Sequence, residues 1–222
     1  MPDSVDALAS ELASIVAAVL GEHSEAPMFG DLDSRLAQLP PSEPVRAITN
    51  PTVAQWLEPA VIACTGPWND LAHLLLAAST NLPWLRSYEN LEPSSRLDAF
   101  QQHYSFQLLA GPTFRGYEPA LGDTSLLAGF TLQAPNVIYP AHHHEAPEVY
   151  GVISGTLDWQ VGDSWRQVGP GEVIVHRPHE SHAMHTGAEP ALTWVAWPHS
   201  PDCHVYMPSL DPADQSMAPT TY

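Results

Sequence analysis

The chain has 222 residues, of which 44% are hydrophobic and 14% charged, the composition of a globular protein with one sizeable core. Its formal net charge is −18, with only seven lysine and arginine residues in total. Nucleic acids and anionic membranes need a basic surface, so the charge argues against both and favours small molecules or a second copy of the chain, a homodimer, as partners. No stretch has the roughly 20 uninterrupted apolar residues of a membrane helix, and the first twenty residues lack the positive start of a secretory signal. We therefore expect a cytoplasmic protein.

The two cysteines, Cys64 and Cys203, are far apart and form no CxxC spacing. This predicts neither a disulfide framework nor a thiolate zinc site.

The first hundred residues are predicted to be mainly helical. Between residues 4 and 20, apolar side chains recur at spacings of three and four, which predicts an amphipathic helix that packs on the rest of the fold or on another subunit. Further helical patterns cover residues 34–39, 51–63 and 68–79, with proline-containing turns between them. We expect residues 1–103 to form a helical N-terminal segment.

From about Phe106 the pattern changes to short β-prone runs separated by Gly, Pro and Asp. Such regular spacing is typical of an antiparallel sandwich or barrel, which we expect over residues 104–222. The predicted strands are Leu126–Gln133, Asn136–Tyr139, Glu148–Ser154, Thr156–Val161, Glu172–His176, Ala191–Trp197 and His204–Met207.

The segment 139–150, with the sequence YPAHHHEAPEVY, carries the densest chemistry. Side chains two apart in a strand share a face, so His142 and His144 are predicted to point together into the barrel. Glu148 and Tyr150 keep the same parity, although Pro147 predicts a bend before them. Imidazoles and a carboxylate are costly to bury inside a barrel unless they coordinate something.

A second segment follows, in which Gly169-Pro170-Gly171 makes a turn into a strand that Pro178 ends, and His182 begins the next strand. A single buried histidine is usually structural, but two strand-spaced histidines, a carboxylate and a further histidine provide nitrogen and oxygen ligands for one divalent transition metal. Zinc, iron, nickel, cobalt and manganese all accept this set, so the pattern does not select among them.

These two segments resemble the two motifs of the cupin superfamily: HxH, a glutamate four residues later, a glycine seven further on, then PG, a proline and a histidine. The resemblance covers about 45 residues and implies a mainly β fold, the cupin double-stranded β-helix or jelly-roll barrel. It implies His142, His144, Glu148 and His182 as the metal ligands. His179 and His185 are the alternatives for the fourth ligand. A place at the surface or behind the ligands is the favoured interpretation for these two, as it is for His143 and His176.

The run from Tyr139 to Tyr150 resembles a narrower group, the cupin-type dimethylsulfoniopropionate lyases, which also carry a helical N-terminal part. That resemblance implies β-elimination of the substrate to dimethyl sulfide and acrylate, with Tyr150 as the base and Tyr139 assisting. A neighbouring divalent cation favours the phenolate, so a tyrosine here could be a base or a metal ligand. Whether His142 or Tyr150 completes the metal's ligands stays open, as does a purely structural role for either tyrosine.

A sulfonium substrate is a cation without a hydrogen-bond donor, and aromatic faces attract such a cation. The predicted barrel strands carry Trp159, Trp194 and Trp197, and the last two have opposite parity, so at most one of them faces the interior. We favour Trp197 and Trp159 as substrate-binding residues, with plain core packing as the alternative.

Two other classes of function fit the same ligands. One is another cupin metalloenzyme such as an iron dioxygenase, which would need bound iron and would consume oxygen, whereas a lyase turns over without it. The other is a non-catalytic metal-binding cupin.

Overall fold

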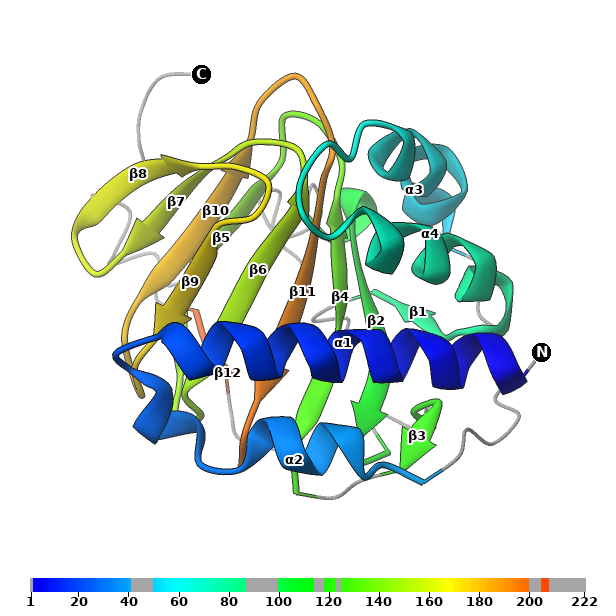
Figure 1. Ribbon diagram of the computed structural model, residues 1–222. Coiled ribbons are helices and arrows are strands. Elements are labelled where there is room, and N and C mark those ends of the chain that lie inside the picture. The colour runs from blue at the N-terminus through cyan, green and yellow to red at the C-terminus, as the bar shows by residue number, and fades with distance from the viewer. Residues whose placement is uncertain are drawn as a thin grey trace.

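Two mainly antiparallel sheets face each other, and a layer of helices covers the outer face of the larger sheet (Figure 1). The computed structural model describes residues 2–40, 50–86, 100–113, 118–122, 125–199 and 205–207. The chain is mainly β, with its longer helices in the N-terminal part.

The helices lie where the sequence predicts them, to within about two residues at each end. They are α1 (Pro2–Glu22), α2 (Leu32–Ala37), α3 (Pro51–Ile62) and α4 (Asn69–Ala78), with short 3-10 helices η1 (Ala26–Phe29) and η2 (Ser79–Asn81). The start of α3 has a clear local cause, because Asn50 caps it: its side-chain oxygen accepts a 2.9 Å hydrogen bond from the Thr52 amide, and Pro51 occupies the first turn.

By length and composition, α1 is the one helix among the described residues that could cross a membrane. Its large apolar side chains are mostly buried within the chain, however, and Leu8, Leu12 and Val16 have no exposed surface. The helix runs across the larger sheet in Figure 1 and shares one core with the sheet's outer face. Here α1 serves as a core helix of the fold.

The larger sheet has the strand order β1-β2-β4-β11-β6-β9, with β3 beside β2, and the smaller has the order β12-β5-β10-β7-β8. From β4 to β11 successive strands alternate between the two sheets, except that the hairpin of β7 and β8 lies wholly in the smaller sheet. This is the jelly-roll topology of the cupin barrel. The strands are β1 (Trp84–Leu85), β2 (Tyr104–Gly111), β3 (Leu121–Gly122), β4 (Leu127–Gln133), β5 (Ile138–His144), β6 (Glu148–Ser154), β7 (Leu157–Val161), β8 (Ser164–Val168), β9 (Val173–His176), β10 (His182–Thr186), β11 (Ala191–Trp197) and β12 (Val205–Tyr206).

The predicted strands 148–154 and 191–197 match β6 and β11 residue for residue. The sequence pattern missed β8, because this strand is exposed over its first four residues and carries no apolar run. It also placed too short a strand before the histidines, since β5 continues to His144. The boundary at residue 104 stays a prediction; β1, which precedes it, already pairs with β2.

Alternation along the strands of the larger sheet creates two cores. In β11, Leu192, Trp194 and Ala196 belong to the outer core beneath the helices, whereas Val195 and Trp197 belong to the inner core between the sheets. The strand period of two therefore assigns each side chain either to the helical layer or to the barrel interior.

The glycine of the first motif, Gly155, ends β6 with a φ of 81°, in the left-handed region that favours glycine. A Cβ at this position would lie 2.3 Å from the carbonyl oxygen of Pro190. The turn into β7 therefore requires both the conformation and the small size of glycine.

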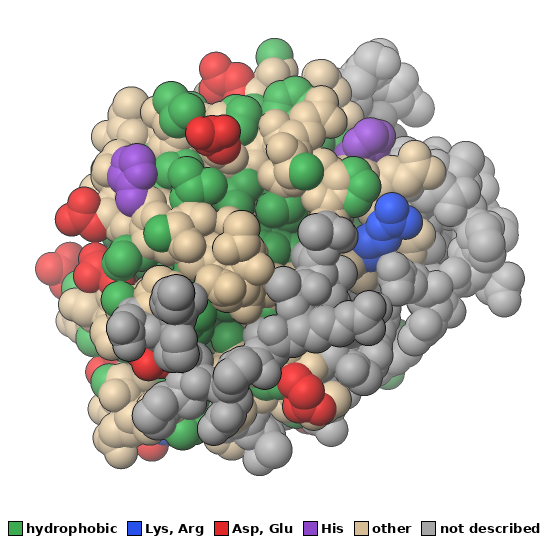
Figure 2. All heavy atoms as spheres, turned by 90° about the vertical axis from the view of Figure 1, so that its right-hand side faces the viewer, with side chains coloured by type: hydrophobic (Ala, Val, Ile, Leu, Met, Phe, Trp, Pro, Cys, Tyr) green, Lys and Arg blue, Asp and Glu red, His purple; other side chains and the backbone are tan. Residues whose placement is uncertain are grey.

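The acidic surface charge is spread over the face that Figure 2 shows, where acidic side chains are scattered among apolar and uncharged ones. This pattern suits a solvated surface. Cys64 is buried, and its thiol lies 3.2 Å from the carbonyl oxygen of Ile153, whereas Cys203 falls outside the described residues.

Candidate metal centre

The candidate site is built from two cross-strand pairs, one on each sheet. His182 on β10 pairs with His142 on β5 in the smaller sheet, and Glu148 on β6 pairs with His176 on β9 in the larger sheet. All four side chains are buried. The rings of His176 and His182 stack with centroids 3.8 Å apart, so the two pairs meet across the barrel interior.

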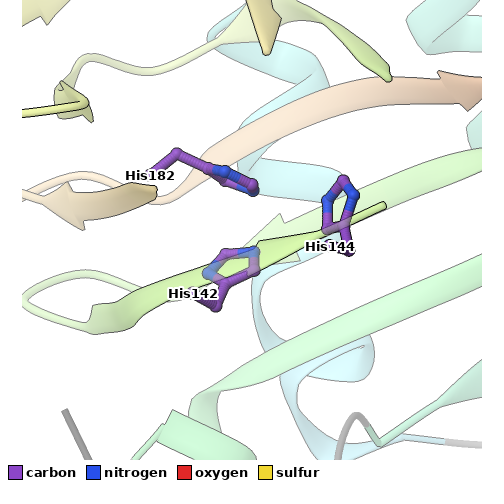
Figure 3. Close-up of side chains that lie close together, drawn as sticks. All are labelled: His142, His144 and His182. Atoms are coloured by element: carbon purple, nitrogen blue, oxygen red, sulfur yellow. The ribbon is translucent and has the colours of Figure 1, made fainter. Parts of the chain in front are cut away.

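Three histidines converge in this interior, as Figure 3 shows for His142, His144 and His182. The ring centroid of His182 lies 4.0 Å from that of His142 and 5.1 Å from that of His144. One ligand atom from each of the three lies within 4.8 Å of the others, and the same holds for Glu148, His176 and His182. Each of these groups could hold a metal ion.

Backbone carbonyls determine which ring nitrogen carries the proton. Nδ1 of His142 lies 2.9 Å from the Pro140 oxygen, Nδ1 of His144 lies 2.8 Å from the Ala146 oxygen, and Nδ1 of His182 lies 2.9 Å from the Glu180 oxygen. A carbonyl only accepts, so each Nδ1 donates, and in the neutral ring each Nε2 keeps its lone pair. All three histidines thus offer Nε2 as a ligand atom.

Both oxygens of Glu148 are engaged. The Trp197 indole N–H donates to Oε1 at 2.7 Å, and Nδ1 of His176 lies 2.8 Å from Oε2. Oε2 also lies 3.1 Å from Nε2 of His182 and 3.4 Å from Nε2 of His144. The carboxylate is thereby aimed at the histidine nitrogens.

The fit to a cation follows from these contacts. Nε2 of His144 and Nε2 of His182 are buried and have no hydrogen-bond partner, yet they face a carboxylate oxygen. Neutral imidazole nitrogens and a carboxylate oxygen are all acceptors, and acceptors at this distance repel unless a proton or a metal cation lies between them. Separations of about 3 Å are those of neighbouring ligands around a metal with bonds of about 2.1 Å.

Burial and neighbouring charges shift the pKa values of the site residues in different directions. Burial, followed by the charge of His182, holds the pKa of His142 well below its usual range and lowers the pKa of His176 to about 3. Burial would also lower the pKa of His144, but the negative charge of Glu148 raises it above its usual value. Burial would raise the pKa of Glu148, but the charge of His144 and the hydrogen bond from His176 hold it well below its usual value. At neutral pH the site therefore contains a carboxylate beside neutral His142 and His176.

The two motif tyrosines occupy different sides of the site. Tyr139 stacks on His142 with ring centroids 4.1 Å apart, and it continues into an aromatic group with Phe100 and Tyr104. Tyr150 follows Glu148 by two residues and is buried in the inner core. Its ring centroid lies 5.0 Å from that of Trp159 and 5.9 Å from that of His176.

The three tryptophans on the barrel strands differ in which core they occupy. Trp197 lies in the inner core, with its ring 4.3 Å from His144. Trp159 is fully buried there, and its indole N–H donates to Nε2 of His176 at 3.0 Å. Trp194 points to the outer core and packs edge-on against Trp68, as its opposite parity requires.

The remaining histidines lie away from the ligand groups. His179 has a φ of 63° in the turn before β10, and its ring lies near that of His143 at 6.2 Å. Nδ1 of His185 lies 3.8 Å from Asp158. Among the described residues neither His179 nor His185 joins a group that could hold a metal, so neither is supported as the fourth ligand.

Sequence reasoning placed His176 at the surface or behind the ligands, and the structure puts it behind Glu148 with no exposed surface. The alternation of Ile174 and His176 could have indicated an inward side chain, but the pairing of β9 with β6 cannot be read from spacing. The aromatic group of Phe100 and Tyr104 was missed, because these residues precede the motif by some forty positions.

Solved structures share this fold. The structure matches the crystal structure of the dimethylsulfoniopropionate lyase DddQ from Ruegeria pomeroyi with a TM-score of 0.72 and 21% identity, over 93% of this chain and 98% of that one. A second match, to a structure reported for the dimethylsulfoniopropionate lyases RdDddP and RnDddQII, has a TM-score of 0.66 and 22% identity, over 91% and 98% of the two chains. At these identities the likeness establishes the fold.

Sequence comparison establishes the family. The chain is 29% identical to the dimethylsulfoniopropionate lyase DddQ of Ruegeria pomeroyi over 125 residues, which make up 55% of this chain and 57% of that protein. The model of the dimethylsulfoniopropionate lyase family matches residues 29–193, a range that includes both motifs and all four predicted ligands. The chain therefore belongs to the dimethylsulfoniopropionate lyase family.

Proposed function

We propose that this protein is a metal-dependent carbon–sulfur lyase that cleaves dimethylsulfoniopropionate to dimethyl sulfide and acrylate by tyrosine-assisted β-elimination. His142, His144, Glu148 and His182 hold one divalent transition metal, whether zinc, iron, nickel, cobalt or manganese. Family membership supports the substrate, and the chemistry of the buried donors supports the metal.

One observation carries the proposal: the partnerless Nε2 atoms of His144 and His182 face Oε2 of Glu148 at 3.4 and 3.1 Å inside a buried site. A divalent cation turns three mutually repelling acceptors into ligands. His176 is not needed as a ligand, because its two nitrogens already bond to Trp159 and Glu148.

A bound divalent cation supplies an electrophile for the substrate carboxylate, which acidifies the neighbouring C–H bond and stabilises the charge that develops there. The Tyr150 oxygen then takes the proton from that carbon. The electron pair forms the carbon–carbon double bond of acrylate as the C–S bond breaks. Dimethyl sulfide leaves as a neutral molecule, so the reaction needs no general acid at the sulfur.

Tyr139 is proposed to assist Tyr150. Its support is the stack on His142, which brings its phenol ring against a proposed ligand. Tyr150 itself stays an alternative ligand to His142 when no substrate is bound.

The sulfonium group needs a surface of aromatic faces, each worth about 0.5–2 kcal/mol for a cation. Trp197 fits this role by its position beside His144. Trp159 stays a weaker proposal for substrate contact, since its described contacts are with Tyr150 and His176.

A cytoplasmic location, a homodimer, and the absence of nucleic-acid and membrane partners stay predictions. The apolar face of α1, which could have packed on a second subunit, is largely buried within its own chain.

The test is release of dimethyl sulfide into the headspace when purified, metal-replete protein is given dimethylsulfoniopropionate in an anaerobic vial. We expect dimethyl sulfide and acrylate in equal amounts. If no dimethyl sulfide is released, the lyase assignment is overturned. If a product forms from the substrate only in a matched aerobic vial, an iron dioxygenase is favoured.

A further inference from the structure

His176 has no part in the reaction described so far, although it is fully buried at the centre of the site. It faces Glu148 directly, because β6 and β9 pair in the register that sets these two residues opposite each other. A histidine without exposed surface is stable in this place only if both ring nitrogens find partners.

Two hydrogen bonds define the state of this ring. The Trp159 indole N–H, which can only donate, lies 3.0 Å from Nε2 of His176. Nε2 must therefore be the acceptor, and the ring proton of the neutral imidazole is on Nδ1. Nδ1 then donates to Oε2 of Glu148 at 2.8 Å.

The same chain of bonds excludes His176 as a metal ligand, although it lies close enough to Glu148 and His182 to form a ligand group. Its one lone pair is used by the indole, and its other nitrogen carries the proton. Its flat face covers the ring of His182 at 3.8 Å with an interplanar angle of 15°. The ring thus touches one proposed ligand by hydrogen bond and another by stacking.

We propose that His176 is a positioning residue that acts through Glu148. The Trp159 indole holds His176 in its Nδ1–H form, and His176 with Trp197 holds the two oxygens of Glu148 in place. A neutral donor fixes the carboxylate without neutralising it, so the full negative charge of Glu148 stays available to a cation. This role deepens the proposed metal site and rests on it.

Two substitutions of His176 distinguish the effect of losing its hydrogen-bond donor from the effect of losing its ring. In His176→Asn, the amide nitrogen can take the place of Nδ1 and donate to Glu148. In His176→Leu, the volume is similar and the donor is gone. Loss of a partner behind a metal ligand typically weakens metal binding about 10- to 100-fold. We therefore expect Zn²⁺ to bind His176→Leu about 10- to 100-fold more weakly than wild type, and His176→Asn within a few-fold of wild type.

The measurement is competition for Zn²⁺ between the full chain and a chromophoric chelator, with the d–d spectrum of the Co²⁺-loaded protein as a second readout. Trp159→Phe should also weaken Zn²⁺ binding, since the lock on the His176 tautomer is lost. Thr193→Val is the matched control: it removes a buried 2.6 Å hydrogen bond to Thr131 that does not involve Glu148, and should leave the affinity unchanged.

Each outcome decides between the claims. Equal Zn²⁺ affinity in wild type and His176→Leu, or equal losses in His176→Leu and His176→Asn, would overturn the positioning role while leaving the metal site intact. A wild-type protein that binds no stoichiometric Zn²⁺ or Co²⁺ would overturn the proposed metal site itself. If His176→Leu fails to fold, His176→Asn and Trp159→Phe still test the role, because a positioning donor requires the first to bind well and the second to bind weakly.

Discussion

The two faces of the larger sheet are built from the same strands but have different roles. The outer face, beneath the helices, is built from fully buried apolar side chains such as Trp194, Phe130 and Leu192. The inner face carries Glu148, His176 and Tyr150 on β6 and β9. Because side chains alternate along a strand, stability and chemistry are separated at the scale of one residue. Substitutions on one face should therefore leave the property of the other largely intact.

The largest effect is expected for Tyr150→Phe on the inner face. Removing a general base typically costs about 10²–10⁴-fold in rate, so kcat for dimethyl sulfide release should fall by that factor. Zn²⁺ stoichiometry and unfolding free energy should change little. Tyr206→Phe, at a half-exposed ring on β12, is the control and should keep its activity. A fully active Tyr150→Phe would remove this mechanism.

Trp194→Ala tests the outer face. This side chain has no exposed surface and packs on Trp68, so its truncation should lower the free energy of unfolding by about 3–5 kcal/mol in urea titrations. Zn²⁺ should still bind the folded protein in a 1:1 ratio. A loss below about 1 kcal/mol, or a selective loss of Zn²⁺ binding at full stability, would break the separation of the two faces.

Trp197→Phe tests the inner face with a smaller expected effect than Tyr150→Phe. The ring is kept, but the 2.7 Å hydrogen bond from the indole to Oε1 of Glu148 is lost. We expect Zn²⁺ affinity to fall about 10- to 100-fold in chelator competition. Trp165→Phe, a partly exposed ring on β8, should bind Zn²⁺ like wild type. Unchanged affinity in Trp197→Phe would show that Glu148 is held without the indole.

Arg166→Gln should have the smallest effect. Arg166 and Glu172 form a 2.7 Å ion pair, but both side chains are about half exposed. Such pairs contribute about 0.2–1 kcal/mol and less in high salt. Urea titration at low and high salt should find a loss within that range that shrinks as salt is added. A larger loss that does not depend on salt would contradict the view that this contact is an ordinary exposed ion pair.

Much of this organisation could be predicted from the sequence, because it follows local rules. Periodicity located the helices, and β6 and β11 were found to the residue from their apolar content and flanking turns. The strand period also predicted that His142, His144 and Glu148 share the barrel interior, where all three are buried.

What the sequence could not supply was the pairing between distant strands. The register that sets Glu148 opposite His176 joins residues 28 positions apart, and no local pattern encodes it. The stack of Tyr139 on Phe100 depends likewise on a segment far upstream, just before β2. An exposed edge strand such as β8 was missed because burial, the source of the pattern, is absent there.

The central claim is that His142, His144, Glu148 and His182 hold a divalent metal on which the lyase reaction depends. The direct measurement is headspace dimethyl sulfide from protein stripped by a chelator and then reloaded with single metals, beside His182→Ala treated in the same way. The account predicts that stripping abolishes release, that reloading restores it in wild type, and that no metal restores it in His182→Ala. Full activity in the stripped protein would contradict the claim.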